Sequence, residues 1–199
     1  MTTPLLSTEL LPAVSLGDGS PGAAAARAET SLRSVVAFGT HVDATIDWAV
    51  ELGEAVPTPG RGRTLERWET LATAARADVA GARVLEPHLD ALAILAEASA
   101  EGHLSIADLA RMGADAYSSW GVFAAESADA RLEARPGDGG VWLLPGVKPW
   151  WSLADCVSHA LVTAWTSPHA GRLVMVSMRG ATGRPQRDGV RGRGRPARG

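Results

Sequence analysis

The spacing of apolar residues changes once along this chain, at about Tyr117, and this change limits the folds that the chain can adopt. In residues 23–116, apolar side chains recur every three or four positions, which is the period of an amphipathic helix. In residues 117–178 they form short runs separated by turn residues, which is typical of strands. Helices followed by strands predict an α+β protein, with an N-terminal helical domain over residues 23–116 and a small antiparallel β-domain over residues 117–178.

The two ends of the helical segment predict shorter helices. Gly39 interrupts the helical pattern of residues 23–54, so we expect one helix on each side of it. Ser105 is a good N-cap residue, and Asp108 stands three positions later. This pair predicts the start of a short helix that reaches Met112.

A longer helix is expected between them. Thr64 is also a good N-cap residue, which places the start of this helix there. The apolar stripe that follows consists of Trp68, Leu71, Ala75, Val79 and Ala82. Because proline lacks an N–H and clashes with the preceding turn, Pro87 predicts a break near Glu86, and the stripe resumes at Leu89.

The β-segment predicts at least one hairpin. Residues 120–125 form a short apolar run that is followed by polar residues. Residues 131–135 and 141–144 flank a Pro-Gly-Asp-Gly-Gly turn signal, which favours a hairpin. Two more strand candidates follow, at residues 160–165 and 172–178.

The two ends of the chain have a composition that does not favour a packed core. Residues 1–22 contain Pro, Gly, Ser and Thr without a clear period and predict a flexible leader. Residues 179–199 hold seven of the 19 basic residues and one of the 22 acidic ones, so the tail carries a charge of +6 and the rest −9. The Arg/Gly/Pro-rich composition of this tail predicts that it is disordered. Its abrupt start also suggests the hypothesis of a frame-shifted segment, because a GC-rich gene encodes these residues in a wrong frame.

Several classes of protein are disfavoured by what the sequence lacks. No apolar run approaches the roughly 20 residues of a membrane span, and the N-terminus has no basic region of a signal peptide, so we expect a cytoplasmic protein. Cys156 is the single cysteine, which excludes an internal disulfide. The five histidines show no metal-ligand spacing, and no phosphate-binding glycine loop is present. The acidic body argues against nucleic-acid binding by the body itself.

Two adjacent tryptophans give the β-segment its most informative feature. Trp150, Trp151 and Ser152 follow Lys148 and Pro149 at an expected strand edge. Because adjacent strand residues point to opposite faces, one ring is able to pack in the core while the other meets a planar ligand. Ser152 would share the face of Trp150 and hydrogen-bond that ligand. The alternative is that both rings are core or interface residues.

The residues around these rings resemble two motifs of the acyl-CoA dehydrogenase family. Ala125-Glu126-Ser127 stands where that family has a T-E-P-like element at the end of a hydrophobic strand. Residues 144–152 resemble a later strand that reads roughly L-N-G-x-K-x-W-I-T. The residues in matching places are Gly146, Lys148, Trp150 and Ser152. The resemblance covers roughly residues 23–178, and the family's N-terminal domain is also helical.

The resemblance implies a flavoprotein that holds FAD between these two elements. It assigns cofactor-binding positions to Ala125, Trp150, Trp151 and Ser152, with Trp150 against the isoalloxazine ring, Ser152 at its edge and backbone contact only from Ala125. The family reaction is the α,β-dehydrogenation of an acyl-CoA thioester, in which the flavin accepts a hydride. In the family, the catalytic glutamate comes from a C-terminal helical bundle that we do not find in this sequence. The resemblance therefore implies no catalytic residue in this chain.

Other interpretations of the sequence stay open beside this one. A homo-oligomer or a separate partner chain would supply the bundle in a split flavoprotein, and a flavin oxidase or monooxygenase on the same scaffold is a related possibility. Residues 193–196 read Arg-Gly-Arg-Pro, which resembles the core of an A·T-hook that binds the DNA minor groove. An inert helical-plus-β remnant is the third alternative.

Overall fold

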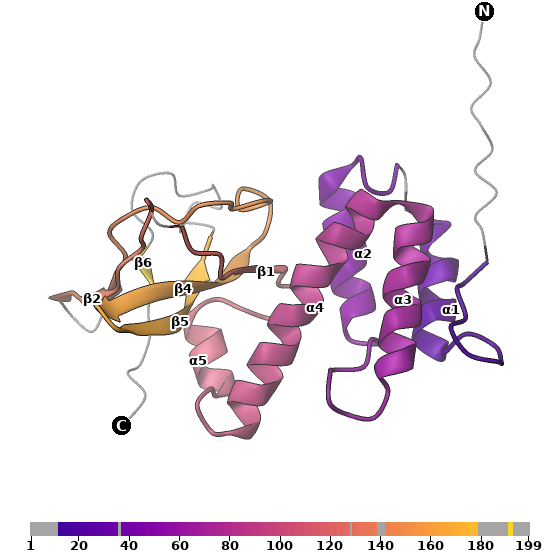
Figure 1. Ribbon diagram of the computed structural model, residues 1–199, viewed down its shortest axis with the longest axis horizontal. Helices are drawn as coiled ribbons and strands as arrows, with labels where there is room; N and C mark the ends of the chain where they lie inside the picture. The colour runs from indigo at the N-terminus through magenta and orange to yellow at the C-terminus, as the bar shows by residue number, and fades with distance from the viewer. Residues whose placement is uncertain (1–11, 36, 128, 139–141, 179–190, 193–199) are drawn as a thin grey trace, which may run out of the picture.

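The computed structural model describes residues 12–35, 37–127, 129–138, 142–178 and 191–192 of the chain. In chain order its elements are α1 (Ala23–Leu32), α2 (Val42–Gly53), α3 (Thr64–Ala77), α4 (Val79–Ala100), α5 (Ile106–Arg111), β1 (Trp120–Phe123), β2 (Arg135–Pro136), β3 (Trp142–Leu143), β4 (His159–Ser167), β5 (Ala170–Ser177) and β6 (Arg191–Gly192). The fold is therefore of the mixed α+β class. Figure 1 shows α1, α2 and α3 at one end, the strands at the other, and α4 between them.

The sequence signals for the shorter helices are confirmed. Gly39 lies between α1 and α2 with a φ of 80°, a conformation that glycine adopts readily. At the start of α5, the Ser105 hydroxyl accepts the backbone N–H of Asp108, and the Asp108 carboxylate accepts the backbone N–H of Ser105. This reciprocal pair is a capping box, which satisfies N–H groups that a helix start otherwise leaves unpaired.

The expected position of the helix break is wrong. The chain breaks at Asp78 instead of Glu86, and Pro87 lies inside α4. Asp78 has an extended backbone, and its carboxylate accepts the backbone N–H of Gly81 at 2.8 Å, so it caps a new helix. Thr64, which we expected to be the N-cap of α3, is its first helical residue, and Arg63 occupies the cap position.

The apolar stripe predicted for this region is also wrong in part. Trp68 is 58 % exposed and Val79 is 67 % exposed, whereas α3 buries Glu69, Thr70 and Thr73. Helix α1 packs against α3, and residues 12–22 donate backbone N–H groups to Glu69 and Thr73 of this polar face.

The described part of the leader is held to α3 by backbone donors. The Glu69 carboxylate accepts the backbone N–H groups of Leu16 at 3.0 Å and Gly22 at 2.7 Å, and these bonds lower its pKa. The hydroxyl of Thr73 accepts the N–H of Val14 at 2.9 Å. A segment without helical or strand period is thus ordered here by side-chain acceptors, which differs from the loose leader that we expected.

The strands form one mixed and one antiparallel sheet. The first has the order β1-β4-β5, in which β1 pairs parallel with β4 and β4 pairs antiparallel with β5. The second has the order β2-β3-β6, and its antiparallel β2–β3 pair confirms the predicted pairing, although β2 is shorter than expected and includes Pro136, which we expected in the turn. The expectation of an antiparallel β-domain is therefore wrong for β1. Parallel pairing needs a long crossover, and residues 124–158 provide it.

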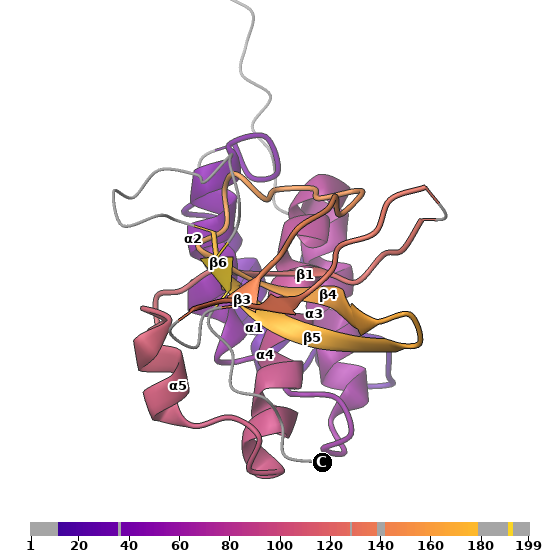
Figure 2. The ribbon, with the colours of Figure 1, turned by 90° about the vertical axis from the view of Figure 1, so that its left-hand side faces the viewer.

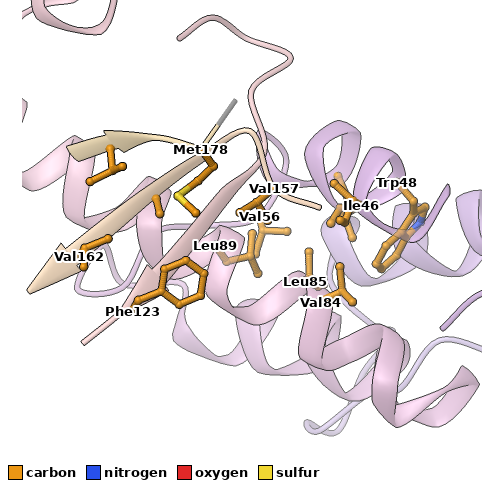
Figure 3. Packing of buried hydrophobic residues seen from close by; sticks show 14 of the residues in the cluster. Ile46, Trp48, Val56, Val84, Leu85, Leu89, Phe123, Val157, Val162 and Met178 are labelled. Carbon is orange, nitrogen blue, oxygen red and sulfur yellow. The ribbon is translucent and has the colours of Figure 1, made fainter. Parts of the chain in front are cut away.

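One hydrophobic core joins the helices to the first sheet. Phe123 of β1 and Val162 of β4 pack in the same cluster as Leu85 and Leu89 of α4 and Ile46 of α2. Figure 3 shows these side chains converging between the strands and the helices. Figure 2, seen from the side of the strands, shows β4 and β5 in front of the helices and α5 at the lower left. The core thus fixes how the end of β1 lies relative to α2 and α4.

Some expectations concern residues that the structure does not describe. Residues 1–11 of the leader and most of the tail, including the Arg-Gly-Arg-Pro sequence at 193–196, lie outside the described residues. Within the tail, β6 pairs with β3. Among the described helices, none combines the length and the apolar character that crossing a membrane requires.

Candidate functional site

The two segments that resemble the flavoprotein motifs meet in the fold. Glu126 follows β1, and Lys148 lies in the irregular segment of residues 144–158 that leads to β4. The Lys148 ammonium donates to the Glu126 carboxylate at 2.6 Å. Gly146 bridges to Leu132, which holds the beginning of the same irregular segment in place.

Gly146 occupies a position that only glycine fills without strain. Its φ is 114°, and a Cβ built there would lie 2.1 Å from the carbonyl oxygen of Arg131. A side chain would therefore both force an unfavourable backbone conformation and collide with the neighbouring backbone. The glycine lets the segment approach residues 131–132 closely before it reaches Lys148.

The segment that carries the two tryptophans is a loop instead of the expected strand. Trp150 and Leu153 have φ values of 59° and 67°, which lie in the left-handed region. Pro149 has no backbone N–H to give to a sheet, and turns occupy residues 152–156. We refer to residues 146–153 as the aromatic loop. Left-handed conformations of non-glycine residues often mark functional sites.

The aromatic loop separates the two rings, as proposed from the sequence, although it does so without strand geometry. The Trp151 ring stacks on Phe123 of β1 with centroids 5.1 Å apart and planes inclined by 2°. The Trp150 side chain is 76 % exposed. One ring therefore fixes the loop to β1, and the other presents a free face.

The indole N–H of Trp151 lies in an apolar environment. This atom is buried and, among the described residues, has no hydrogen-bond acceptor. Burying a donor without an acceptor costs about 1–3 kcal/mol. The stacking on Phe123 and the remaining apolar contacts of the ring must offset that penalty.

A small cavity lies between the aromatic loop and the helices. Its volume is about 120 Å³. Trp150 and Ser152 of the loop, Phe123 of β1 and Val84 of α4 are among the residues that line it. Its walls are mainly apolar, and Ser152 and His88 supply polar groups.

His88 is the buried titratable residue of this cavity. It is 4 % exposed, and its Nδ1 accepts the backbone N–H of Trp120 at 3.2 Å. Burial disfavours the charged ring and lowers its pKa from 6.5 to about 4. The ring is therefore neutral at pH 7, with its proton on Nε2. Gly53 of α2 packs against it, and a Cβ at Gly53 would lie 2.8 Å from that nitrogen.

The structure brings together only some of the cofactor-binding residues that were predicted from the sequence. Trp150 and Ser152 line the same cavity, and Trp151 reaches it indirectly through Phe123. Ala125 is exposed next to Glu126 and is not among the residues that line the cavity. Sequence reasoning did not select Phe123 or His88. The apolar run of residues 120–125 indicated a strand, but only the fold shows which of its side chains meets Trp151.

The cavity is compatible with part of a planar ligand. Sites that enclose a whole drug-sized ligand measure about 300–1,000 Å³, so a cavity of about 120 Å³ has room for only a part of such a ligand. The exposed face of Trp150 offers a stacking surface at its mouth, and the Ser152 hydroxyl is able to donate or accept. Within the ranges that the structure describes, no group of three His, Cys, Asp or Glu side chains is placed to hold a metal ion.

Comparisons of this chain with family models, with characterised proteins and with solved structures found no match.

Proposed function

We propose that this chain is a flavoprotein of the acyl-CoA dehydrogenase type and that it binds the isoalloxazine ring of FAD against Trp150. One observation carries the proposal. The two sequence elements that resemble the family's flavin-binding motifs meet through the Glu126–Lys148 ion pair, and they leave Trp150 and Ser152 at one cavity. The resemblance was drawn from sequence positions alone, so their meeting in space is independent support.

Each residue of the aromatic loop has a role in this proposal. The exposed face of Trp150 stacks on the flavin ring, since aromatic faces bind flat π-systems well. Ser152 hydrogen-bonds the edge of the ring. Trp151 stays on Phe123 and holds the loop, so its contribution to binding is indirect. Ala125 contributes at most a backbone contact near the end of β1.

Trp150 and Ser152 would hold the ring of FAD, and the bound cofactor would supply the hydride-accepting chemistry of acyl-CoA dehydrogenation. The residues of this chain bind and orient the ring, and we assign none of them as a catalytic residue.

Because Trp150 and Val147 of the aromatic loop are exposed, we also propose that a second copy or a partner chain covers this side.

A titration of the full chain with FAD tests the proposal. We expect the fluorescence of FAD to be quenched in a saturable way, because an indole stacked on the ring quenches it. Trp150→Ala removes a stacking partner worth about 1–3 kcal/mol and is expected to weaken binding about tenfold. Ser152→Ala removes one hydrogen bond, worth about 1 kcal/mol, and is expected to weaken binding about fivefold.

Trp68→Ala is the matched control, because Trp68 is also an exposed tryptophan but lies on α3. We expect its dissociation constant for FAD to equal that of the unsubstituted chain. If the unsubstituted chain shows no saturable binding, or if Trp68→Ala weakens binding as much as Trp150→Ala, the proposed flavin site is wrong.

A further inference from the structure

Lys148 is a buried lysine with partners on two other segments. Its side chain is 1 % exposed. The ammonium donates to Glu126 Oε1 at 2.6 Å and to the hydroxyl of Thr163 on β4 at 2.5 Å. Lysine rarely lies this deep unless its charge is paired, because removing an ammonium from water is unfavourable. The position therefore depends on the acceptors around it.

The Glu126 carboxylate accepts further hydrogen bonds besides the one from Lys148. Its Oε1 also accepts the Thr163 hydroxyl at 2.7 Å, and its Oε2 accepts the indole N–H of Trp165 at 3.2 Å. The hydrogen bond from Lys148 is the main cause that lowers the pKa of Glu126 to about 2. The carboxylate is therefore ionised at neutral pH.

These contacts join three parts of the fold at one point. They connect the end of β1, the middle of β4 and the aromatic loop. The loop is also attached by the stacking of Trp151 on Phe123 and by the backbone N–H of Val147, which donates to the carbonyl of Arg131 at 3.2 Å. Trp150 lies between the ion pair and the stack, with Lys148 on one side of it in sequence and Trp151 on the other. Its ring is therefore placed by neighbours that are themselves fixed.

An apolar residue at position 148 would avoid the desolvation penalty of a buried ammonium, but its contacts would not be directional. Charge-assisted hydrogen bonds fix distances and angles, whereas apolar contacts allow a side chain to shift. A buried ion pair often contributes little net stability and serves to specify one arrangement. At this point of the chain the arrangement that it specifies is the course of the aromatic loop.

We infer that Lys148 is a positioning residue, whose ion pair with Glu126 holds the aromatic loop so that Trp150 faces its ligand. The ligand part of this inference rests on the proposed flavin site. The loop part does not, since it concerns the free chain. The two parts are therefore separated by two measurements on the same variants.

Hydrogen exchange of the free, full chain tests the loop part. Backbone N–H groups of Val147, Ala154, Cys156 and Val157 are bonded to carbonyl oxygens and are expected to exchange slowly. Lys148→Met keeps the length of the side chain and removes the charge. We expect it to raise exchange over residues 146–157 about tenfold relative to β4, because the loop loses its charge-assisted hydrogen bonds to Glu126 and Thr163.

Two further variants separate local from general effects. Glu126→Gln keeps the shape of the side chain but leaves the buried Lys148 ammonium without its counter-charge. Lys148→Met leaves only the partly exposed Glu126 carboxylate without its partner, so it should fold even if Glu126→Gln does not. Arg67→Met is the matched control, because the Arg67 side chain is 8 % exposed and pairs with Asp90 at 2.9 Å, away from the loop. We expect Glu126→Gln to raise exchange in the loop and Arg67→Met to leave it unchanged.

The FAD titration of the same variants tests the ligand part. If the loop exchanges faster and FAD binds about tenfold more weakly in Lys148→Met and Glu126→Gln only, the inference holds in full. Unchanged exchange in the loop overturns it. Faster exchange with unchanged FAD affinity overturns the ligand part. Faster exchange in a chain that binds no FAD even without a substitution keeps Lys148 as the anchor of the loop and refutes the flavin site.

Discussion

His88 should make the stability of this chain depend on pH between about 4 and 6.5, and the size of the effect follows from its burial. The unfolded ring has its ordinary pKa near 6.5, and the folded ring titrates at about 4. Between these values the unfolded chain binds a proton that the folded chain does not. Stability is therefore unaffected above pH 6.5 and falls as the pH falls towards 4.

The size of this loss of stability follows from the two pKa values. Each unit of separation corresponds to about 1.4 kcal/mol, so the loss reaches about 3 kcal/mol once the pH lies below both values. At pH 5 the predicted loss relative to pH 7 is about 2 kcal/mol. His88 is almost fully buried, so screening by solvent reduces this value little.

Urea unfolding at pH 5 and pH 7 measures the effect, with His88→Asn as the comparison. The side-chain oxygen of asparagine is able to accept the Trp120 N–H in place of Nδ1, and it does not titrate. We expect the unsubstituted chain to lose about 2 kcal/mol more than His88→Asn between the two pH values. His103→Gln, which removes an exposed histidine, should keep the full loss. Equal losses in the unsubstituted chain and in His88→Asn refute the assignment.

Two further substitutions test the backbone that surrounds the site. Gly146→Ala is expected to destabilise the chain by more than about 2 kcal/mol in thermal unfolding, because its Cβ would meet the Arg131 carbonyl. Gly60→Ala, at a φ of 75° with no atom within 4 Å, should show only the smaller penalty of the left-handed conformation, and an equal effect of both contradicts the collision. Pro87→Ala is expected to raise the free energy of unfolding by about 1–2 kcal/mol, since proline is about 3 kcal/mol less favourable inside a helix and restricts the unfolded chain. A lower midpoint in urea would show that its ring packs better than alanine.

Local signals in the sequence predicted those elements whose causes are local. The capping box of Ser105 and Asp108, the separation of α1 and α2 at Gly39, and the β4–β5 strands all follow from residues a few positions apart. The break before α4 shows the limit of such signals. Asp78 caps the start of α4, whereas Pro87 lies inside this helix without ending it. From the sequence we had expected the proline to end the helix.

Contacts between distant segments produced the parts that the sequence did not predict. Glu69 and Thr73 lie outside the apolar stripe predicted for this helix, yet they are buried, and residues 12–22 donate backbone N–H groups to them. In the same way, the parallel pairing of β1 with β4 depends on a crossover of residues 124–158 that no turn signal specifies. Periodicity identifies which face is polar, but it does not identify what that face will meet.

The candidate site combines both kinds of cause. Its composition was visible in sequence, because Trp150, Trp151 and Ser152 stand together and Lys148 precedes them. Its geometry was not, since the separation of the two rings comes from a loop with left-handed residues, a stack on Phe123 and an ion pair to a residue 22 positions away. Alternation along a strand would turn Trp150 and Trp151 apart at any edge of any sheet. Here the ion pair and the stack fix the loop on either side of Trp150, so the exposure of that one ring is a consequence of tertiary contacts, and this is why substitutions at Lys148 and Glu126 test the site as directly as substitutions at Trp150 itself.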